Sequence, residues 1–352
     1  MKVAIEISLL QDKQHKVRGV GSYIANLQKG LENTPTSLSF QFFTSDSTLD
    51  KDVDLIHYPY FDPFRKLELV HKNIKTVITI HDLTPIILKN KFPVGFRGSI
   101  NWQINKINLR KLAGIITDSE SSKKDIIRLA GVASEKVQAI HLAAGEEFKQ
   151  IEGDTWQVGI REKYRLPDRF ALYVGDVTPN KNLPRLIEAV KKTNIPCVLV
   201  GKALASSDFD KDHPWNRDVA AVQEMIKDDK QFILPGFVSN SDLVALYNLA
   251  TIFVMPSLYE GFGLPVLEAM QSGCPVITSG EGSLKEVAGQ SAIFVNPRDV
   301  EDMVGKIKII TEDIDMQKKY AILGLRQAEK FSWHKTAKET VSVYEKILSA
   351  EK

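Results

Sequence analysis

The chain has 352 residues, of which 43% are hydrophobic and 26% are charged, and its net charge is +2. This composition is typical of a globular protein, and at about 150 residues per domain the length favours two domains. The low net charge gives no reason to expect nucleic acid as a partner, and no apolar run approaches the roughly 20 residues of a membrane span.

Short β-branched runs alternate with helical stretches along the chain, which is typical of parallel βαβ units. The strands expected in the first half are 2–9, 40–44, 54–58, 76–81, 114–118 and 136–141. The strands expected in the second half are 170–175, 197–201, 231–234, 251–255, 275–278 and 292–295. Apolar runs such as Ile252-Phe-Val-Met255 indicate strands covered on both faces. The pattern predicts an α/β protein with two Rossmann-like, doubly wound domains.

The domain division is expected in the polar stretch 162–169, which gives a first domain over 1–165 and a second over 166–330. Helical segments follow the last strand, and Ser332 is expected to cap the final helix. Cys197 and Cys274 lie in apolar surroundings, which indicates buried thiols and suits a reducing cytoplasm. We therefore expect a cytoplasmic protein, or one attached peripherally at the inner face of a membrane.

The first half carries polar groups near its expected strands. A glycine-rich loop with Gly19 and Gly21 precedes a helix expected from Tyr23, but it lacks the third glycine and the acid of a dinucleotide fingerprint. His81 ends a strand, at the sheet edge where ligands bind, although a lone histidine is more often structural. Asp52-Val-Asp54 has the spacing of a metal-binding pair but precedes a buried strand, so we expect no metal site there.

The interval between Asp82 and Asp118 holds no acidic residue. A helix is expected over 102–112, with Ile100, Ile104 and Ile107 on a buried stripe. The basic side chains could hold anionic lipid headgroups or a lipid-phosphate acceptor, or they could form a solvated helix face. They are Lys89, Lys91, Arg97, Lys106, Arg110 and Lys111.

The run 258–278 contains the most informative motif. Glu260 precedes Gly261-Phe-Gly-Leu264, and a helix beginning at Pro265 carries Glu268. A helix N-terminus with flexible glycines suits a phosphate, whereas the two carboxylates suit vicinal hydroxyls. A diphosphate between two diol-bearing rings describes a nucleotide sugar. An ordinary crossover loop with two solvated glutamates is the alternative.

Glu260 and Glu268, with Gly-Phe-Gly-Leu-Pro between them, resemble the E-x7-E motif of retaining glycosyltransferases of family 4. That family has the two-domain GT-B fold and an active site in the cleft between its domains. The segment 331–352 resembles the family's final helix, which crosses back to the first domain. Lys181, in the loop that begins at Gly175, matches the lysine that contacts the donor diphosphate.

The resemblance implies catalytic roles for Glu260, His81 and Lys181, and donor binding without a metal or other cofactor. Glu260 would bind the sugar hydroxyls and Glu268 the ribose hydroxyls, and His81 would lie near the donor sugar and acceptor. The other implied donor-binding residues are Gly261, Phe262, Gly263, Leu264, Gly19, Gly21, Phe237 and Val238.

The loop departs from the family pattern, because Asp176 and Asn180 stand where an arginine is usual. Arg185 or Lys202 could supply the second cation. We expect a hexosyltransferase that uses a nucleotide-diphosphate sugar, with GDP-mannose favoured, and a glycan or lipid-linked glycan acceptor. The alternatives are another GT-B enzyme, such as an epimerase or a phosphorylase, and a non-catalytic protein that binds sugar nucleotides or glycans.

Overall fold

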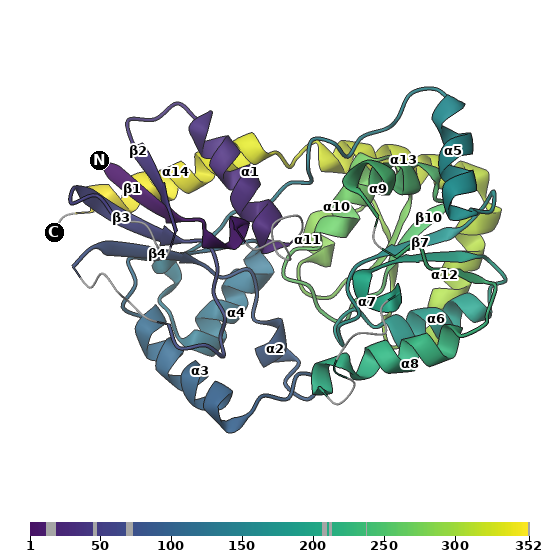
Figure 1. Cartoon of the computed structure of the whole chain (residues 1–352), viewed down its shortest axis with the longest axis horizontal. Coiled ribbons are helices and arrows are strands. Elements are labelled where there is room, and N and C mark those ends of the chain that lie inside the picture. Colours follow the sequence, from purple (N-terminus) through teal and green to yellow (C-terminus); the bar gives the residue numbers. More distant parts are fainter. Residues whose placement is uncertain are drawn as a thin grey trace. The chain divides into compact units, whose positions relative to one another are not determined.

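The computed structural model describes residues 1–11, 19–44, 48–67, 73–205, 210, 213–236 and 238–350. They form two compact units, each built on its own parallel sheet (Figure 1). Unit 1 comprises Met1–Leu83, Val94–Ala143 and Phe331–Lys352, and unit 2 comprises Thr84–Pro93 and Ala144–Lys330. The units therefore divide at residue 143, and the short helix α2 (Thr84–Ile87) is grouped with unit 2.

Unit 1 is a doubly wound sheet. Its six parallel strands have the order β2-β1-β3-β4-β5-β6. The strands are β1 (Lys2–Glu6), β2 (Ser39–Phe43), β3 (Val53–Tyr58), β4 (Lys75–Thr79), β5 (Gly114–Thr117) and β6 (Val137–Ala139). The helices are α1 (Val20–Glu32), α3 (Phe96–Leu109), α4 (Glu120–Ala130) and α14 (Trp333–Ser349). Helices α1 and α14 cover one face of the sheet, and α3 and α4 lie on the other (Figure 1).

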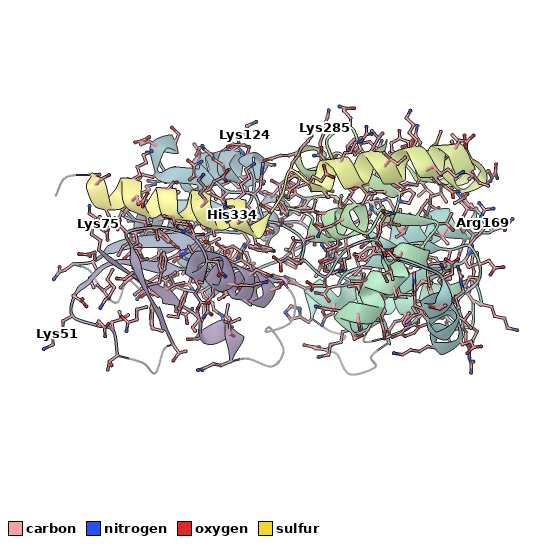
Figure 2. The ribbon with its side chains drawn as sticks, turned by 90° about the horizontal axis from the view of Figure 1, so that it is seen from above. Lys51, Lys75, Lys124, Arg169, Lys285 and His334 are labelled. Atoms are coloured by element: carbon pink, nitrogen blue, oxygen red, sulfur yellow. The ribbon has the colours of Figure 1, made fainter. Side chains whose placement is uncertain are left out.

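Helix α14 is an integral part of unit 1. Its N-cap is Ser332, as expected, and the Ser332 Oγ accepts a hydrogen bond from Lys335 N at 3.2 Å. Helix α1 approaches it closely at Gly30, where an added Cβ would lie 2.9 Å from the Cβ of Ala337. Lys75 lies beside the other end of α14 (Figure 2), and its ammonium donates to the carbonyls of Ile347 and Ala350 at 2.7 and 2.9 Å.

Unit 2 repeats the architecture, with the strand order β12-β11-β10-β7-β8-β9. Its strands are β7 (Ala171–Val174), β8 (Cys197–Val200), β9 (Phe232–Ile233), β10 (Ile252–Met255), β11 (Val276–Ser279) and β12 (Ile293–Val295). Its longer helices are α5 (Thr155–Tyr164), α6 (Leu183–Lys191), α8 (Arg217–Ile226), α9 (Asn240–Leu249), α10 (Leu264–Gln271), α12 (Val300–Glu312) and α13 (Ile314–Ala328). Two short helices are α7 (Lys202–Ala205) and α11 (Leu284–Ala288).

The inner strands of unit 2 are apolar because both faces of the sheet are covered. Every residue of β7, β8, β10 and β11 is buried. Cys197 and Cys274 are buried free thiols, and burial raises the pKa of Cys197 to about 12. The parallel arrangement leads each strand into a loop at its carboxyl end, which is where sites form in such sheets.

Two details of the helices differ from the expectation. Helix α1 begins at Val20 rather than at Tyr23. Helix α3 spans Phe96–Leu109, and the expected buried stripe of isoleucines is wrong: Ile100 and Ile107 are 43% and 55% exposed. The helix instead buries Trp102, Asn105 and Leu109. A buried asparagine made the inward face look polar in the sequence.

Candidate functional site

The site residues of unit 2 follow two adjacent strands. β7 lies between β10 and β8, so the strand order reverses between β7 and β10. Such a switch point opens a crevice at the carboxyl ends of the strands. The loop after β7 carries Lys181, and the loop after β10 carries Glu260.

The two crossovers share a local design. Each helix follows a residue with positive φ, Asn182 at 60° before α6 and Gly263 at 98° before α10. Each helix also has a proline in its first turn, where the missing N–H costs no helical hydrogen bond. Gly263 has a second constraint, because a Cβ there would lie 2.6 Å from Leu284 Cδ2.

Lys181 and Glu260 form a bidentate ion pair. Lys181 Nζ lies 2.8 Å from Glu260 Oε1 and 2.9 Å from Oε2. Their side chains are only 17% and 9% exposed. Charged hydrogen bonds shielded from water in this way are stronger than those on an open surface. The structure therefore brings together a cation and a carboxylate that the sequence places 79 residues apart.

Asn180 joins the two loops. Its backbone carbonyl accepts from Leu258 N at 2.7 Å, and its side-chain amide donates to Tyr259 O at 3.1 Å. The residue is 8% exposed. Asn180, which stands where the family usually has an arginine, thus helps to position the Glu260 loop.

The expected sources of a second cation lie elsewhere. The guanidinium of Arg185 donates to Asn182 Oδ1 at 2.9 Å, and Lys202 is exposed at the start of α7. Asp176 is also exposed. Lys181 is therefore the cation for which the structure gives direct contact with the Glu260 loop.

Ser283 anchors the Glu260 loop through hydrogen bonds to its backbone carbonyls. Ser283 N and Oγ both donate to Glu260 O at 3.1 Å, and Oγ also lies 2.8 Å from Phe262 O. Gly282 has φ of 62°, and a Cβ there would lie 2.4 Å from the same Glu260 carbonyl. The backbone around Gly261 is therefore held in one conformation, with both Gly261 and Phe262 buried.

The remaining donor-side candidates lie around α10. Leu264 begins the helix, and Glu268 is held by Tyr247, whose hydroxyl donates to Glu268 Oε2 at 3.0 Å. Val238 is 1% exposed, so its side chain belongs to the core. Phe237 lies outside the described residues.

His81 of unit 1 is held between two acceptors. Its Nδ1 lies 2.8 Å from Asp118 Oδ2, and its Nε2 lies 3.2 Å from Pro59 O. The Pro59 carbonyl can only accept, so Nε2 is the donor in that contact. Burial raises the pKa of Asp118, so the proton between Nδ1 and Oδ2 can belong to either group. Burial lowers the pKa of His81, but the charge of Asp118 and its hydrogen bond outweigh burial and raise the pKa above 6.5. The pairing with Asp118 therefore favours the protonated form of His81.

The glycine-rich loop of unit 1 leads into the same neighbourhood through Tyr23. Gly19 is the N-cap of α1 with φ of 61°, and Gly21 is buried in the first turn. The Tyr23 ring packs edge-on against His81 with ring centroids 4.8 Å apart. Arg18, which precedes this loop, lies outside the described residues.

A buried hydrogen-bonded chain supports this region. Tyr23 OH lies 3.1 Å from Thr79 Oγ1, which lies 2.8 Å from His57 Nε2. His57 Nδ1 lies 2.6 Å from Tyr344 OH of α14. Burial lowers the pKa of His57 to about 3, so this histidine is neutral. Helix α14 is thereby connected to β4, which ends at Thr79, two residues before His81.

The aspartates at the start of β3 have a structural role. Asp52 Oδ1 accepts from the Lys2 ammonium at 2.8 Å, and Asp54 Oδ2 accepts from Lys2 N at 2.8 Å. Among the described residues, no group of three or more acidic, histidine or cysteine side chains could hold a metal ion. No helix in the described ranges is long and apolar enough to cross a bilayer.

Sequence reasoning missed Asp118. It follows β5 directly and its side chain is 5% exposed, but no local pattern links it to His81, 37 residues earlier. Its position at the end of a parallel strand was the available signal. Of the expected residues, Lys181 and Glu260 are brought into contact in unit 2, and His81 belongs to unit 1.

Two family models match the chain. The model "Glycosyl transferases group 1" matches residues 156–324, and "Glycosyltransferase Family 4" matches residues 12–144. The serotype-specific mannosyltransferase WbdA of Escherichia coli is 32% identical over 284 residues, which are 78% of this chain and 34% of that protein. This chain therefore spans about a third of the length of that relative. The O-antigen chain mannosyltransferase B of Escherichia coli is 29% identical over 303 residues, or 83% of this chain and 75% of that protein.

Solved structures resemble the chain over its whole length. Sucrose-phosphate synthase from Thermosynechococcus elongatus gives a TM-score of 0.77 at 18% identity and covers 100% of each chain. Anabaena HepE in complex with UDP and glucose gives 0.73 at 16% identity, over 98% of this chain and 100% of that one. At such identities the likeness concerns the fold, and it confirms the expected GT-B fold of two Rossmann-like domains.

Proposed function

Since the chain belongs to family 4 of the glycosyltransferases, we propose that it transfers a hexose from a nucleotide-diphosphate sugar to an acceptor hydroxyl, with retention of the anomeric configuration. The proposed donor is GDP-mannose, and the names of the two Escherichia coli mannosyltransferases support its mannosyl group. The proposed acceptor is a glycan or a lipid-linked glycan. The observation that carries the proposal is the shielded pair of Lys181 and Glu260 at the switch point of unit 2.

The ion pair suits a donor that carries both a charge and hydroxyl groups. The diphosphate takes the Lys181 ammonium, and the sugar hydroxyls donate to the Glu260 carboxylate. Each buried charge exchanges one partner for another, so neither is left unpaired when the donor enters. The backbone of residues 261–264 approaches the diphosphate, and Glu268 accepts hydrogen bonds from the ribose hydroxyls.

Leaving-group stabilisation is the main catalytic effect in this proposal. As the bond between the anomeric carbon and the phosphate oxygen breaks, negative charge grows on the diphosphate, and a fixed ammonium stabilises it. The acceptor oxygen attacks on the same face, and its proton passes to the departing phosphate oxygen. This step retains the configuration without a carboxylate nucleophile.

His81 is a positioning and charge-bearing group in this mechanism. Its Nδ1 is paired with Asp118, and its Nε2 lies against the Pro59 carbonyl. A sugar or acceptor hydroxyl replaces the Pro59 carbonyl as the acceptor from Nε2. Asp118 then keeps the ring oriented and protonated.

The proposed location is the cytoplasm, where the nucleotide sugar is available, with peripheral contact at the inner face of an anionic membrane. A lipid-linked acceptor presents its hydroxyl at that surface. The net charge of +2 supports no partnership with nucleic acid.

The test begins with a thermal-shift panel of UDP-, GDP- and ADP-sugars, followed by turnover of the stabilising donor. Lys181→Ala is expected to lower turnover about 100-fold or more. Lys285→Ala, an exposed lysine of α11 in the same unit (labelled in Figure 2), is the matched control and keeps full activity. Both variants are compared at a temperature at which circular dichroism shows each to be folded.

Full activity of Lys181→Ala would refute the diphosphate assignment. A thermal shift without turnover would identify a binding protein instead. Conversion of the donor sugar into its epimer, without transfer to an acceptor, would identify an epimerase. Release of a sugar phosphate would identify a phosphorylase.

A further inference from the structure

The outward face of α3 exposes a row of large apolar side chains. Phe96, Ile100 and Ile107 are 81%, 43% and 55% exposed. At 3.6 residues per turn their directions fall within a sector of about 40°. The exposed apolar residues therefore form one stripe along the helix, which we name the α3 stripe.

The α3 stripe is presented by a firmly anchored helix. Trp102, Asn105 and Leu109 are buried on the opposite side of α3. Asn105 Nδ2 donates to Pro63 O at 3.1 Å and to Arg65 O at 2.7 Å, and its Oδ1 accepts from Leu67 N at 2.8 Å. Rotating α3 to bury its isoleucines would break all of these bonds. The apolar exposure is thus fixed by the register of the helix.

Basic side chains flank the α3 stripe on both sides. On the same helical projection, three basic positions lie within about 100° of the stripe. They are Arg97 on one side, and Lys106 and the C-cap residue Arg110 on the other. Lys111 is exposed in the turn that follows the helix. The sequence holds no acidic residue from 83 to 117. The nearby loop adds the 88% exposed side chain of Arg65, next to Asp62 at 3.5 Å.

We propose that the α3 stripe is a membrane-docking surface that inserts its apolar side chains among anionic lipids. The proposal rests on the proposed function, because it gives the lipid-linked acceptor a surface at which to meet unit 1. An apolar stripe between basic flanks matches an interfacial helix, whose cations bind headgroups while its apolar residues enter the acyl boundary. A second copy of the chain is a poorer occupant, since pairing two such faces would bring like charges together.

The position of α3 is compatible with this role. The helix lies at the periphery of unit 1, beside α4 (Figure 1). Lys106 lies 6.0 Å from the Trp102 ring, and Arg110 Nε donates to Ala130 O at 2.9 Å. These contacts keep the side chains of Lys106 and Arg110 close to the helix.

Vesicle flotation tests the proposal with the full chain. The expected result is binding to phosphatidylcholine vesicles that contain phosphatidylglycerol, and little binding to phosphatidylcholine alone. The double variant Ile100→Asn/Ile107→Asn should lower the partition coefficient about tenfold or more. The matched control is Ile309→Asn/Ile322→Asn, whose isoleucines lie on α12 and α13 of unit 2 and are each 51% exposed. It should bind like the wild type.

Three results would overturn the proposal: no binding by the wild type, equal loss in both double variants, or binding that is insensitive to anionic lipid. Sedimentation equilibrium covers the rival occupant, because a dimer broken only by the α3 variant would assign the stripe to a second copy. Transfer to a soluble acceptor is measured without vesicles. The α3 variant should keep that activity, so failure of docking and failure of the proposed function remain distinguishable.

Discussion

Removing the ammonium of Lys181 should destabilise the protein through the carboxylate that it leaves behind. In Lys181→Met the side chain keeps much of its length, but Glu260, with a side chain 9% exposed, loses its bidentate partner. Breaking a buried pair from one side costs about 3–5 kcal/mol, and partial exposure of Lys181 places this case near 3 kcal/mol. For a unit of this size, about 3 kcal/mol lowers Tm by about 6–12 °C.

The double variant Lys181→Met/Glu260→Gln separates this cause from general damage. Without a buried charge to leave unpaired, the double variant should be more stable than Lys181→Met, with a coupling energy of about 2 kcal/mol. The measurement is differential scanning calorimetry of wild type, both single variants and the double variant, at low and high salt. Because the pair is shielded, high salt should reduce the coupling only slightly.

Additive effects of the two substitutions would refute this reasoning. A drop in Tm of less than about 2 °C in Lys181→Met would also refute it. Either result would mean that water or a rearranged side chain already compensates Glu260. There would then be no reason to expect that the donor must replace both partners of the Lys181–Glu260 ion pair when it binds.

Two further perturbations test the site and the fold. Asp118→Asn should destabilise the protein most at pH values below 6.5. The raised pKa of His81 gives a contribution to stability that is present below its unfolded pKa and is lost as pH rises through its folded pKa. Thermal unfolding measured across pH tests this, and a loss of stability that does not depend on pH would contradict it. Gly201→Ala should lower Tm, because the added Cβ would lie 2.5 Å from Gly175 O. In the control Gly159→Ala, within α5, the added Cβ meets nothing within 4 Å, and the substitution should raise stability by about 0.5–1 kcal/mol. Equal effects of the two substitutions on Tm would contradict the steric argument.

The strands were predictable because their signal is local. A run such as Ile252-Phe-Val-Met255 is apolar throughout, and a strand buried on both faces requires nothing else. The resemblance placed Lys181 and Glu260 at the same donor site, but it did not predict that they would form an ion pair. Their direct contact depends on the order of β7 and β10 in the sheet, which no local pattern specifies.

The errors arose where a residue's partner is distant in sequence. Asn105 looks like a surface residue, but it is fully buried because the loop carbonyls at Pro63 and Arg65 accept its hydrogen bonds. Because Asn105 occupies the buried side of α3, Ile100 and Ile107 of that helix face outward. Asn180 likewise looked like a missing cation, although it holds the carbonyl of Tyr259, 79 residues away.

The path of the chain through α14 sets an order of assembly during translation. Unit 1 takes β1 from residues 2–6 and α14 from residues 333–349, so all of unit 2 is synthesised between them. Unit 2 is therefore fully synthesised before Tyr344 is available to form its hydrogen bond with His57 in unit 1. Until α14 is synthesised, α1 alone covers that face of the first sheet, and a premature stop before α14 would leave unit 1 incomplete.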